Sequence, residues 1–319
     1  MRNIVVFNNL TNKKEPLSGH YPNALNIYTC GPTVYDHSHI GHARASITWD
    51  FIVRFLRYTG VKVIWTRNIT DIDDKIINKA KELELNPDKV ARIYTHSYHE
   101  DMNELNVAWP DFEPRATQYI HEMIDFIQNL LNKKNAYQIE NDVYFSVETF
   151  SNYGQLKGQT TKELEKGYGR IEPNKRKKNP LDFALWKGVK NKDKYGFESP
   201  WGKGRPGWHL ECSVMNYKIF NTKLDIHCGG DDLIFPHHEN EIAQSESFTN
   251  ETFAKYWLHN GMVLVNGKNV KVRRQLHYNK RYLKGILRQC FKIICFKHSL
   301  QNANKFYRRS NTSSSKRNQ

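Results

Sequence analysis

N-I-Y-T-C, residues Asn26 to Cys30, is a short apolar run that breaks at Gly31 and Pro32, which predicts a buried strand followed by a turn. Beyond the turn, apolar residues recur with helical spacing from Ala43 to Tyr58 and predict an amphipathic helix. Val61 to Trp65 is a second short run rich in β-branched residues and predicts another strand. Strand, glycine-bearing turn, helix and strand in this order form the unit of a parallel sheet with right-handed crossovers. This stretch therefore predicts an α/β fold.

The rest of the chain alternates in the same way, with one irregular part. Lysine and glutamate on the outer faces, punctuated by prolines, predict mostly helix from Asp71 to about Asn135. The segment from Gly154 to Gly207 is polar, glycine-rich and basic, which suggests an inserted module or mobile loops. The other expected elements are two strands, a glycine turn and a helix: Asn141–Phe145, Leu224–His227, Cys228–Asp232 and Pro236–Phe248.

Composition excludes several classes of protein. The 319 residues are 39% hydrophobic and 25% charged, which is typical of a globular chain and excludes disorder and a pure coiled coil. No stretch approaches the ~20 apolar residues of a membrane-spanning helix, and the N-terminus lacks the apolar run of a signal peptide. Five scattered cysteines are too few for a disulfide framework, so reduced thiols or metal ligands are expected. We therefore expect a cytoplasmic protein without membrane contact.

The net charge of +15 is concentrated at one end of the chain. Residues 269–319 contain 14 of the 48 lysines and arginines and no aspartate or glutamate. The first 268 residues hold 34 basic and 33 acidic groups, so they are almost neutral. The excess of basic charge, which is typical of nucleic-acid-binding proteins, therefore belongs to residues 269–319 and not to the rest of the chain.

Four dispersed side chains could make a metal site. His237 and Glu241 stand at helical spacing i and i+4, which suits shared coordination of one ion, and His238 with Glu241 at i and i+3 is a second option. Cys30 and Cys212 would complete a zinc set if the fold brought them together. The alternatives are a solvated helix face for the histidines and glutamates and small buried apolar residues for the two cysteines.

Two glycine-bearing turns could bind a nucleotide. His39, Gly41 and His42 lie where the first strand passes into its helix, and a helix N-terminus with unpaired N–H groups attracts phosphate. Gly229, Gly230 and Asp232 follow a later strand, where glycine would admit a ribose and the carboxylate would accept its hydroxyls. A histidine-rich cap and a plain turn with a capping aspartate are the respective alternatives.

Four segments together resemble cysteinyl-tRNA synthetase, a class I aminoacyl-tRNA synthetase. They are T-C-G-P-T-V-Y-D-H-S-H-I-G-H-A-R, W-T-R-N-I-T-D-I-D-D-K-I, R-P-G-W-H-L-E-C-S and F-P-H-H-E-N-E-I-A-Q-S, in this order. The resemblance covers about residues 1–268 and implies one catalytic domain. It implies the class I nucleotide-binding, Rossmann-like parallel sheet, interrupted by a connective insertion at about 100–202. We also expect the helical C-terminal anticodon domain of the family to be missing.

The resemblance also implies roles for individual residues. The zinc ligands of the family fall on Cys30, Cys212, His237 and Glu241, which favours His237 over His238. His39, Gly41 and His42 would hold the ATP phosphates, with His39 and His42 as the catalytic histidines, and Gly229, Gly230 and Asp232 would hold the ribose. Trp208 would line the amino-acid pocket. The implied cofactors are one Zn²⁺ per chain and Mg²⁺ with ATP, and the partners are ATP, L-cysteine and tRNA(Cys), bound by a monomer.

The chain departs from the family after Lys268. The family continues with K-M-S-K-S, whose second lysine stabilises pyrophosphate, whereas this chain reads N-V-K-V-R-R-Q-L from Asn269. Reading from the second base of the Asn269 codon permits A-T-G and then codons for S-K-S-A-G-N-F-I-T-I-K. We therefore expect residues 269–319 to be an out-of-frame, disordered translation, and activity to be impaired. The rival interpretation is a genuine basic arm that binds RNA.

Two other functions fit part of the pattern. A cysteine ligase that joins the adenylate to an amino sugar would share the catalytic core and lack a tRNA domain. A non-catalytic, zinc-stabilised RNA-binding protein would use the basic tail and show no cysteine-dependent ATP turnover. The leading interpretation is a cysteine–tRNA ligase that activates cysteine with ATP and transfers it to tRNA(Cys), with zinc selecting the thiol.

Overall fold

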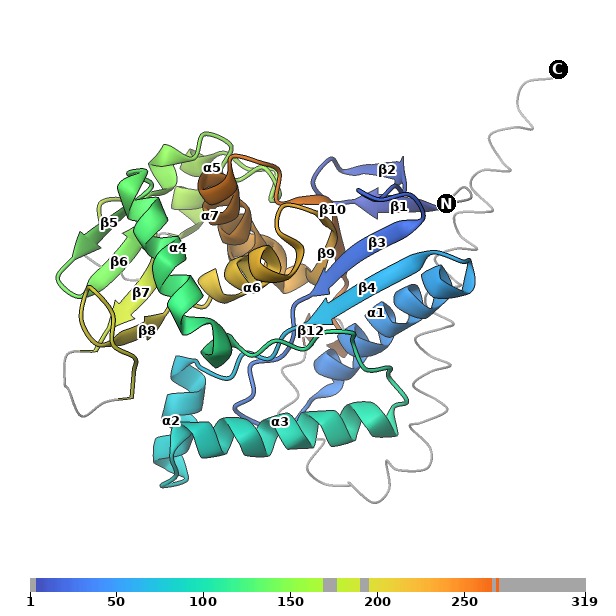
Figure 1. Ribbon diagram of the computed structural model, residues 1–319, viewed down its shortest axis with the longest axis horizontal. Helices are drawn as coiled ribbons and strands as arrows, with labels where there is room; N and C mark the ends of the chain where they lie inside the picture. The colour runs from blue at the N-terminus through green and yellow to red at the C-terminus, as the bar shows by residue number, and fades with distance from the viewer. Residues whose placement is uncertain (1–3, 169–176, 190–194, 266–267, 270–319) are drawn as a thin grey trace.

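The computed structural model describes residues 4–168, 177–189, 195–265 and 268–269. Two four-stranded sheets dominate, one parallel and one antiparallel, and helices cover both (Figure 1). The expected out-of-frame segment, 269–319, lies outside the described residues except for its first residue. No helix in the described ranges is long and apolar enough to cross a membrane.

The parallel sheet has the strand order β10-β9-β3-β4. Its strands are β3 (Ala24–Thr29), β4 (Lys62–Arg67), β9 (Leu224–Gly230) and β10 (Ala254–Asn260). Strands β3 and β4 pair in parallel from Ala24 opposite Lys62 to Thr29 opposite Arg67. All four strands point the same way, so their carboxyl ends share one edge, where a doubly wound sheet binds its ligands. The predicted parallel α/β sheet is thus confirmed.

The crossover between β3 and β4 is helix α1 (Ile40–Tyr58). Trp49, Val53 and Leu56 recur at the spacing of one helix face and are buried against the sheet core. The side chain of His39 accepts the N–H of Gly41 and caps the helix, so the H-I-G-H motif forms its first turn. Helices α2 (Asp74–Glu82) and α3 (Pro87–Glu104) follow, as the lysine- and glutamate-rich pattern predicts, and they pack on each other.

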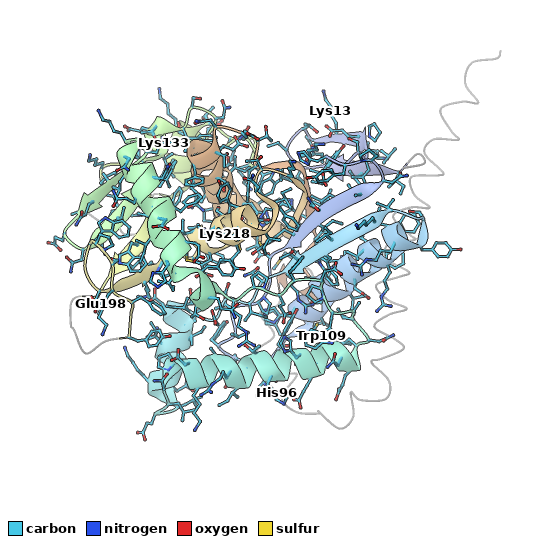
Figure 2. All side chains as sticks on the ribbon, in the orientation of Figure 1. Lys13, His96, Trp109, Lys133, Glu198 and Lys218 are labelled. Carbon is cyan, nitrogen blue, oxygen red and sulfur yellow. The ribbon has the colours of Figure 1, made fainter. Side chains whose placement is uncertain are left out.

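The antiparallel sheet has the order β5-β6-β7-β8. Its strands are β5 (Ala136–Ile139), β6 (Asp142–Phe145), β7 (Phe183–Gly188) and β8 (Gly204–Pro206), and α4 (Ile120–Asn132) packs beside it. The polar stretch from Gly154 to Gly207 therefore contributes two strands, because Phe183, Leu185 and Trp186 fill the core under the sheet. Exposed charged side chains such as Lys13 and Glu198 point away from the body in Figure 2.

Two helices lie between the sheets and carry the polar motifs. Helix α6 (Leu210–Phe220) contains E-C-S-V-M. Helix α7 (Glu239–Thr249) follows η4 (Ile234–His238), a kinked segment in which Phe235 is extended and a cis peptide bond precedes Pro236. The predicted glycine turn from Cys228 to Asp232 is wrong in part. Strand β9 continues through Gly230, because Cys228, Gly229 and Gly230 pair with β10, and the chain turns only at η3 (Asp231–Leu233).

Short elements complete the described fold. A hairpin of β1 (Val5–Asn8) and β2 (Lys13–Pro16) lies beside β10, and β11 (Leu264–Val265) pairs with β12 (Lys268–Asn269). The remaining helices are α5 (Thr161–Tyr168), η1 (Ala116–Tyr119) and η2 (Val147–Thr149).

Candidate metal and nucleotide site

Four predicted ligands converge at the carboxyl edge of the parallel sheet. Cys30 follows β3, Cys212 lies in the first turn of α6, His237 lies in η4, and Glu241 lies in the first turn of α7. One ligand atom from each lies within 4.8 Å of the corresponding atom of every other. The two sulfur atoms are 4.0 Å apart, and Nε2 of His237 is 2.9 Å from Oε1 of Glu241. The exposed-face alternative for these two residues is wrong, since His237 is 2% and Glu241 0% exposed.

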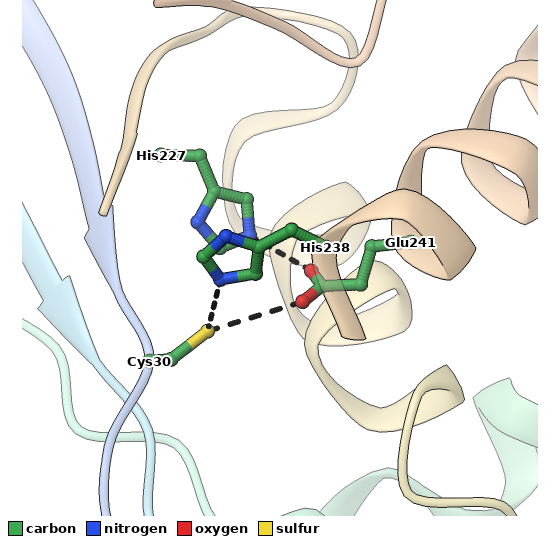
Figure 3. A group of neighbouring side chains, drawn as sticks. All are labelled: Cys30, His227, His238 and Glu241. Carbon is green, nitrogen blue, oxygen red and sulfur yellow. Dashed lines mark hydrogen bonds and ion pairs between the residues drawn. The ribbon is translucent and has the colours of Figure 1, made fainter. Parts of the chain in front are cut away.

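A second group shares two of these residues. Cys30, His227, His238 and Glu241 also place one ligand atom each within 4.8 Å of one another (Figure 3). Nε2 of His238 lies 3.3 Å from the Cys30 sulfur, and Nε2 of His227 lies 2.8 Å from Oε2 of Glu241. Glu241 thus stands between two imidazoles, and geometry alone leaves the choice between adjacent histidines open.

The electrostatics of the first group favour the ionised forms of Glu241 and Cys212, whereas His237 must lose a proton before it can bind a metal. Burial would raise the pKa of Glu241, but His227 and His237 lower it to about 2. Burial would also lower the pKa of His237, yet Glu241 and Cys212 raise it to about 10. The hydrogen bond from Cys30 lowers the pKa of Cys212 to about 6, whereas burial and Cys212 raise that of Cys30. A buried carboxylate beside a thiol of lowered pKa is ready to meet a cation.

The donor set of this group suits zinc. Two thiols, one imidazole and one carboxylate are among the ligands that Zn²⁺ takes in proteins, and sulfur distinguishes the site from the all-oxygen sites of Mg²⁺ and Ca²⁺. The four residues come from separate parts of the packed core, and three of them are buried. The residues present therefore fit the zinc that the sequence predicts.

Aromatic rings border the metal group on one side. The ring of Trp208, half-buried just before α6, stacks on His237 with centroids 4.2 Å apart. Nδ1 of His209 lies 3.1 Å from Nδ1 of His237. The predicted pocket residue Trp208 thus touches a predicted metal ligand.

The predicted phosphate-binding residues form the N-terminus of α1. The rings of His39 and His42 stack with centroids 3.8 Å apart, and Nδ1 of His42 accepts the backbone N–H of His39 at 3.3 Å. Burial, together with His39 and Lys75, lowers the pKa of His42 to about 3. The low pKa favours a neutral His42, which acts through hydrogen bonds, and a Cβ at Gly41 would lie 2.9 Å from the His39 ring, so glycine is needed in this turn.

The predicted ribose-binding residues lie at the end of β9. A Cβ at Gly229 would lie 2.6 Å from the ring of His238, so only glycine fits there. Gly230 closes the strand, and Asp232 is exposed in η3. Because β9 adjoins β3, this turn shares the sheet edge that carries Cys30.

Sequence reasoning missed several residues of the site. His227 and Asn68 are buried, at 0% and 1% exposed, and contact Glu241 and Cys212 respectively. Nδ1 of His238 lies 2.8 Å from Nε2 of His259, so His259 is also in contact with the site. Asn68 lies in the segment W-T-R-N-I-T, just after a predicted strand, and this position could have indicated a site residue. His227 lies within a predicted strand, and nothing in the sequence distinguishes it from an ordinary strand residue.

Comparisons with known proteins identify the family of the chain. The family model for the class I (C) tRNA synthetase catalytic domain matches residues 17–306. Cysteine–tRNA ligases of Thermodesulfovibrio yellowstonii and Sulfurihydrogenibium sp. are 53% and 50% identical over 265 residues, covering 82% and 83% of this chain. That of Brevibacillus brevis is 48% identical over 267 residues, 84% of this chain. The chain spans about half the length of these relatives, 54%, 54% and 57%.

A solved structure shows the same fold at low identity. Mycobacterium tuberculosis methionyl-tRNA synthetase, in complex with methionyl-adenylate, superposes with a TM-score of 0.58 at 13% identity, over 75% of this chain and 57% of its own. This is the fold of the class I synthetases, with the parallel sheet at its centre. The family model matches most of this chain, residues 17–306. The chain therefore belongs to the class I (C) tRNA synthetase catalytic-domain family.

Proposed function

We propose that this chain is the catalytic part of a cysteine–tRNA ligase, which activates L-cysteine with ATP and transfers it to tRNA(Cys). The observation that carries the proposal is the convergence of Cys30, Cys212, His237 and Glu241 in a member of this family. The relatives named cysteine–tRNA ligase support the same activity. Neither alternative function has a specific observation in its favour.

The metal group explains selection of the amino acid. Cys30, Cys212, His237 and Glu241 would hold one Zn²⁺, which would supply a soft Lewis acid that binds the substrate thiolate. Serine offers a hard hydroxyl that stays protonated, so a site that requires a metal–thiolate bond rejects it without editing. Trp208, stacked on His237, would close the amino-acid pocket against water.

The two turns position ATP for attack by the cysteine carboxylate. His39, Gly41 and His42 would hold its phosphates, which enter with Mg²⁺, through ring and backbone N–H groups at the start of α1. Gly229 and Gly230 would let the ribose approach the end of β9, and Asp232 would accept its hydroxyls. Rate enhancement would then come from positioning and charge neutralisation in the step that gives cysteinyl-adenylate and pyrophosphate.

Amino-acid selectivity tests the proposal without relying on turnover. Titration calorimetry on the zinc-loaded chain should show L-cysteine binding and no detectable L-serine binding, and Cys212→Ala should abolish the cysteine signal. Equal binding of both amino acids, or none of either, would overturn the proposal. The buried cysteine variant Cys228→Ala serves as the matched control, because Cys228 belongs to neither candidate metal group.

The reading frame after Lys268 is a separate proposal, with its own test. Pyrophosphate exchange by the chain as written should fall on the order of 10³-fold below that of a chain with the restored K-M-S-K-S frame, because one cationic contact to a transferring phosphoryl group is lost. Equal rates in both chains would refute the impairment. Resequencing the gene across the codons of Lys268 and Asn269 tests the shifted frame itself.

A further inference from the structure

Residues 153–157, here called the anchor loop, hold the first turn of helix α7. The side chain of Glu239, 0% exposed, accepts three hydrogen bonds from backbone N–H groups of this loop. The donors are Gly154, Leu156 and Lys157, at 2.9, 3.0 and 3.0 Å. The next side chain of α7, that of Asn240, accepts the hydroxyl hydrogen of Tyr153. Two consecutive residues of α7 are thus bound by one loop.

The anchor loop is itself fixed in the fold. Tyr153 is buried in the hydrophobic cluster of the antiparallel sheet, and Leu156 is buried in the cluster that contains Cys212. Gly154 has a φ of +97°, and a Cβ there would lie 2.0 Å from the carbonyl oxygen of Gln159, so the turn that aims its N–H group requires glycine. The loop therefore offers α7 a packed support that joins two cores.

The start of α7 depends on this support. The structure describes α7 over its whole length, and the side chain of the preceding residue, His238, makes no capping hydrogen bond to it. Residues two apart in an α-helix are rotated by about 200°, so Glu239 and Glu241 leave opposite sides of the turn. Glu241 faces the metal group, whereas Glu239 faces the anchor loop. The turn that carries a predicted ligand is therefore held from behind.

We propose that Glu239 is a positioning residue of the metal group, which fixes the rotation of α7 about its axis and thereby the direction of the Glu241 carboxylate. Without its hydrogen bonds, the N–H groups of the anchor loop would lose their acceptor and the turn its support. Residues that orient a ligand without touching the metal commonly change metal affinity by about 10- to 100-fold. This inference rests on the proposed function, because it takes Glu241 as a zinc ligand.

The substitution Glu239→Gln keeps the shape of the side chain and replaces one acceptor oxygen by an amide nitrogen, which cannot accept an N–H group. The zinc dissociation constant, measured by competition with a chromophoric chelator, should rise about tenfold, the lower end of that range. In the cobalt(II)-loaded chain the d–d absorption bands should shift, because they report the geometry of the ligands. The metal-free chain should also become less stable to urea.

Glu246→Gln is the matched control. Glu246 lies toward the other end of α7, and its carboxylate also accepts a backbone N–H group, that of Phe253 at 3.1 Å. This variant should lose stability but keep the zinc affinity and the cobalt bands of the parent chain.

Tyr153→Phe is a second, milder variant. It removes only the hydroxyl that donates to Asn240, so it should weaken zinc binding by a smaller factor and shift the cobalt bands in the same direction. If Glu239→Gln does not fold, Tyr153→Phe decides the question with the same two measurements.

Two results would overturn the inference while leaving the proposed function intact. One is a zinc affinity and a cobalt spectrum that neither Glu239→Gln nor Tyr153→Phe changes, since the hydrogen bonds would then serve stability alone. The other is an equal loss of zinc affinity in Glu246→Gln, which would mean that any weakening of α7 has this effect. Failure of the parent chain to bind zinc at all would instead refute the proposed function.

Discussion

Two buried carboxylates, Asp182 in the antiparallel sheet region and Glu241 at the edge of the parallel sheet, have opposite surroundings. Asp182 is 1% exposed and accepts three hydrogen bonds, from the backbone N–H groups of Val147 and Asn179 and from the hydroxyl of Tyr137. Glu241 is 0% exposed and lies among two imidazoles and the Cys30 thiol.

The difference separates a structural carboxylate from a ligand. The donors to Asp182 are part of the fold, so its carboxyl oxygens are hydrogen-bonded without any ligand. The neighbours of Glu241 are groups that lose protons and offer lone pairs, and a cation completes such an arrangement better than further hydrogen bonds do.

The largest effect is expected for the ligands themselves. Cys30→Ala and Cys212→Ala should each lower zinc affinity by more than the ~100-fold limit seen for residues outside a ligand set. Metal analysis after gel filtration should then find zinc in the parent and in Cys228→Ala, and none in either ligand variant. Retention of zinc by both ligand variants would place the ion elsewhere.

The adjacent histidines should differ. His237→Ala removes the imidazole of the first group, whereas His238→Ala removes that of the second. We expect the loss of zinc affinity in His237→Ala to exceed that in His238→Ala by more than tenfold. The reason is that the first group contains both thiols and zinc prefers sulfur. The reverse order in a chelator competition would assign the ion to the second group.

Asp182 should respond in stability and not in metal content. Asp182→Ala leaves three donors without an acceptor and should lower the free energy of unfolding by on the order of 3 kcal/mol in urea. Asp125→Ala, an exposed aspartate on α4, should change it little. A folded Asp182→Ala chain that had lost zinc would show that the two regions are not independent.

The smallest effect is a pH dependence at Glu113. Burial would raise the pKa of Glu113, but the hydrogen bond from His99 and the charge of Arg67 lower it below its usual range. A carboxyl group with a lowered folded-state pKa stabilises the fold above its unfolded-state pKa, and this stability is lost as the pH falls through the folded-state value. The stability difference between the parent and Glu113→Gln should therefore be largest near neutral pH and shrink as the pH falls below about 4. A difference that stayed constant on acidification would contradict this.

The local pattern predicted most of the parallel half of the fold. The first strand, its helix and the next strand could be read because apolar spacing is a local property, and they appear as β3, α1 and β4 within a few residues. The turn at Cys228–Asp232 was misplaced because two consecutive glycines, Gly229 and Gly230, suggest a turn. In the fold, pairing with β10 keeps both residues extended. Strands β7 and β8 lie in a polar stretch, and their pairing with each other and with β6 is likewise a tertiary property that the local pattern does not predict.

The site was predictable only in part. The spacing of His237 and Glu241 indicated a shared ion, and the structure places their side chains in contact. Cys30 and Cys212 are 182 residues apart, so only the fold could bring their sulfur atoms to 4.0 Å. The contact of Asn68 with Cys212 depends on which atoms face each other in the fold, and no spacing rule predicts this.

X-ray absorption at the zinc edge of the loaded chain tests the central claim most directly. If Cys30, Cys212, His237 and Glu241 hold the ion, the spectrum will show two sulfur neighbours at about 2.3 Å and two lighter neighbours at about 2.0–2.2 Å. A spectrum with one sulfur or none would contradict this ligand set.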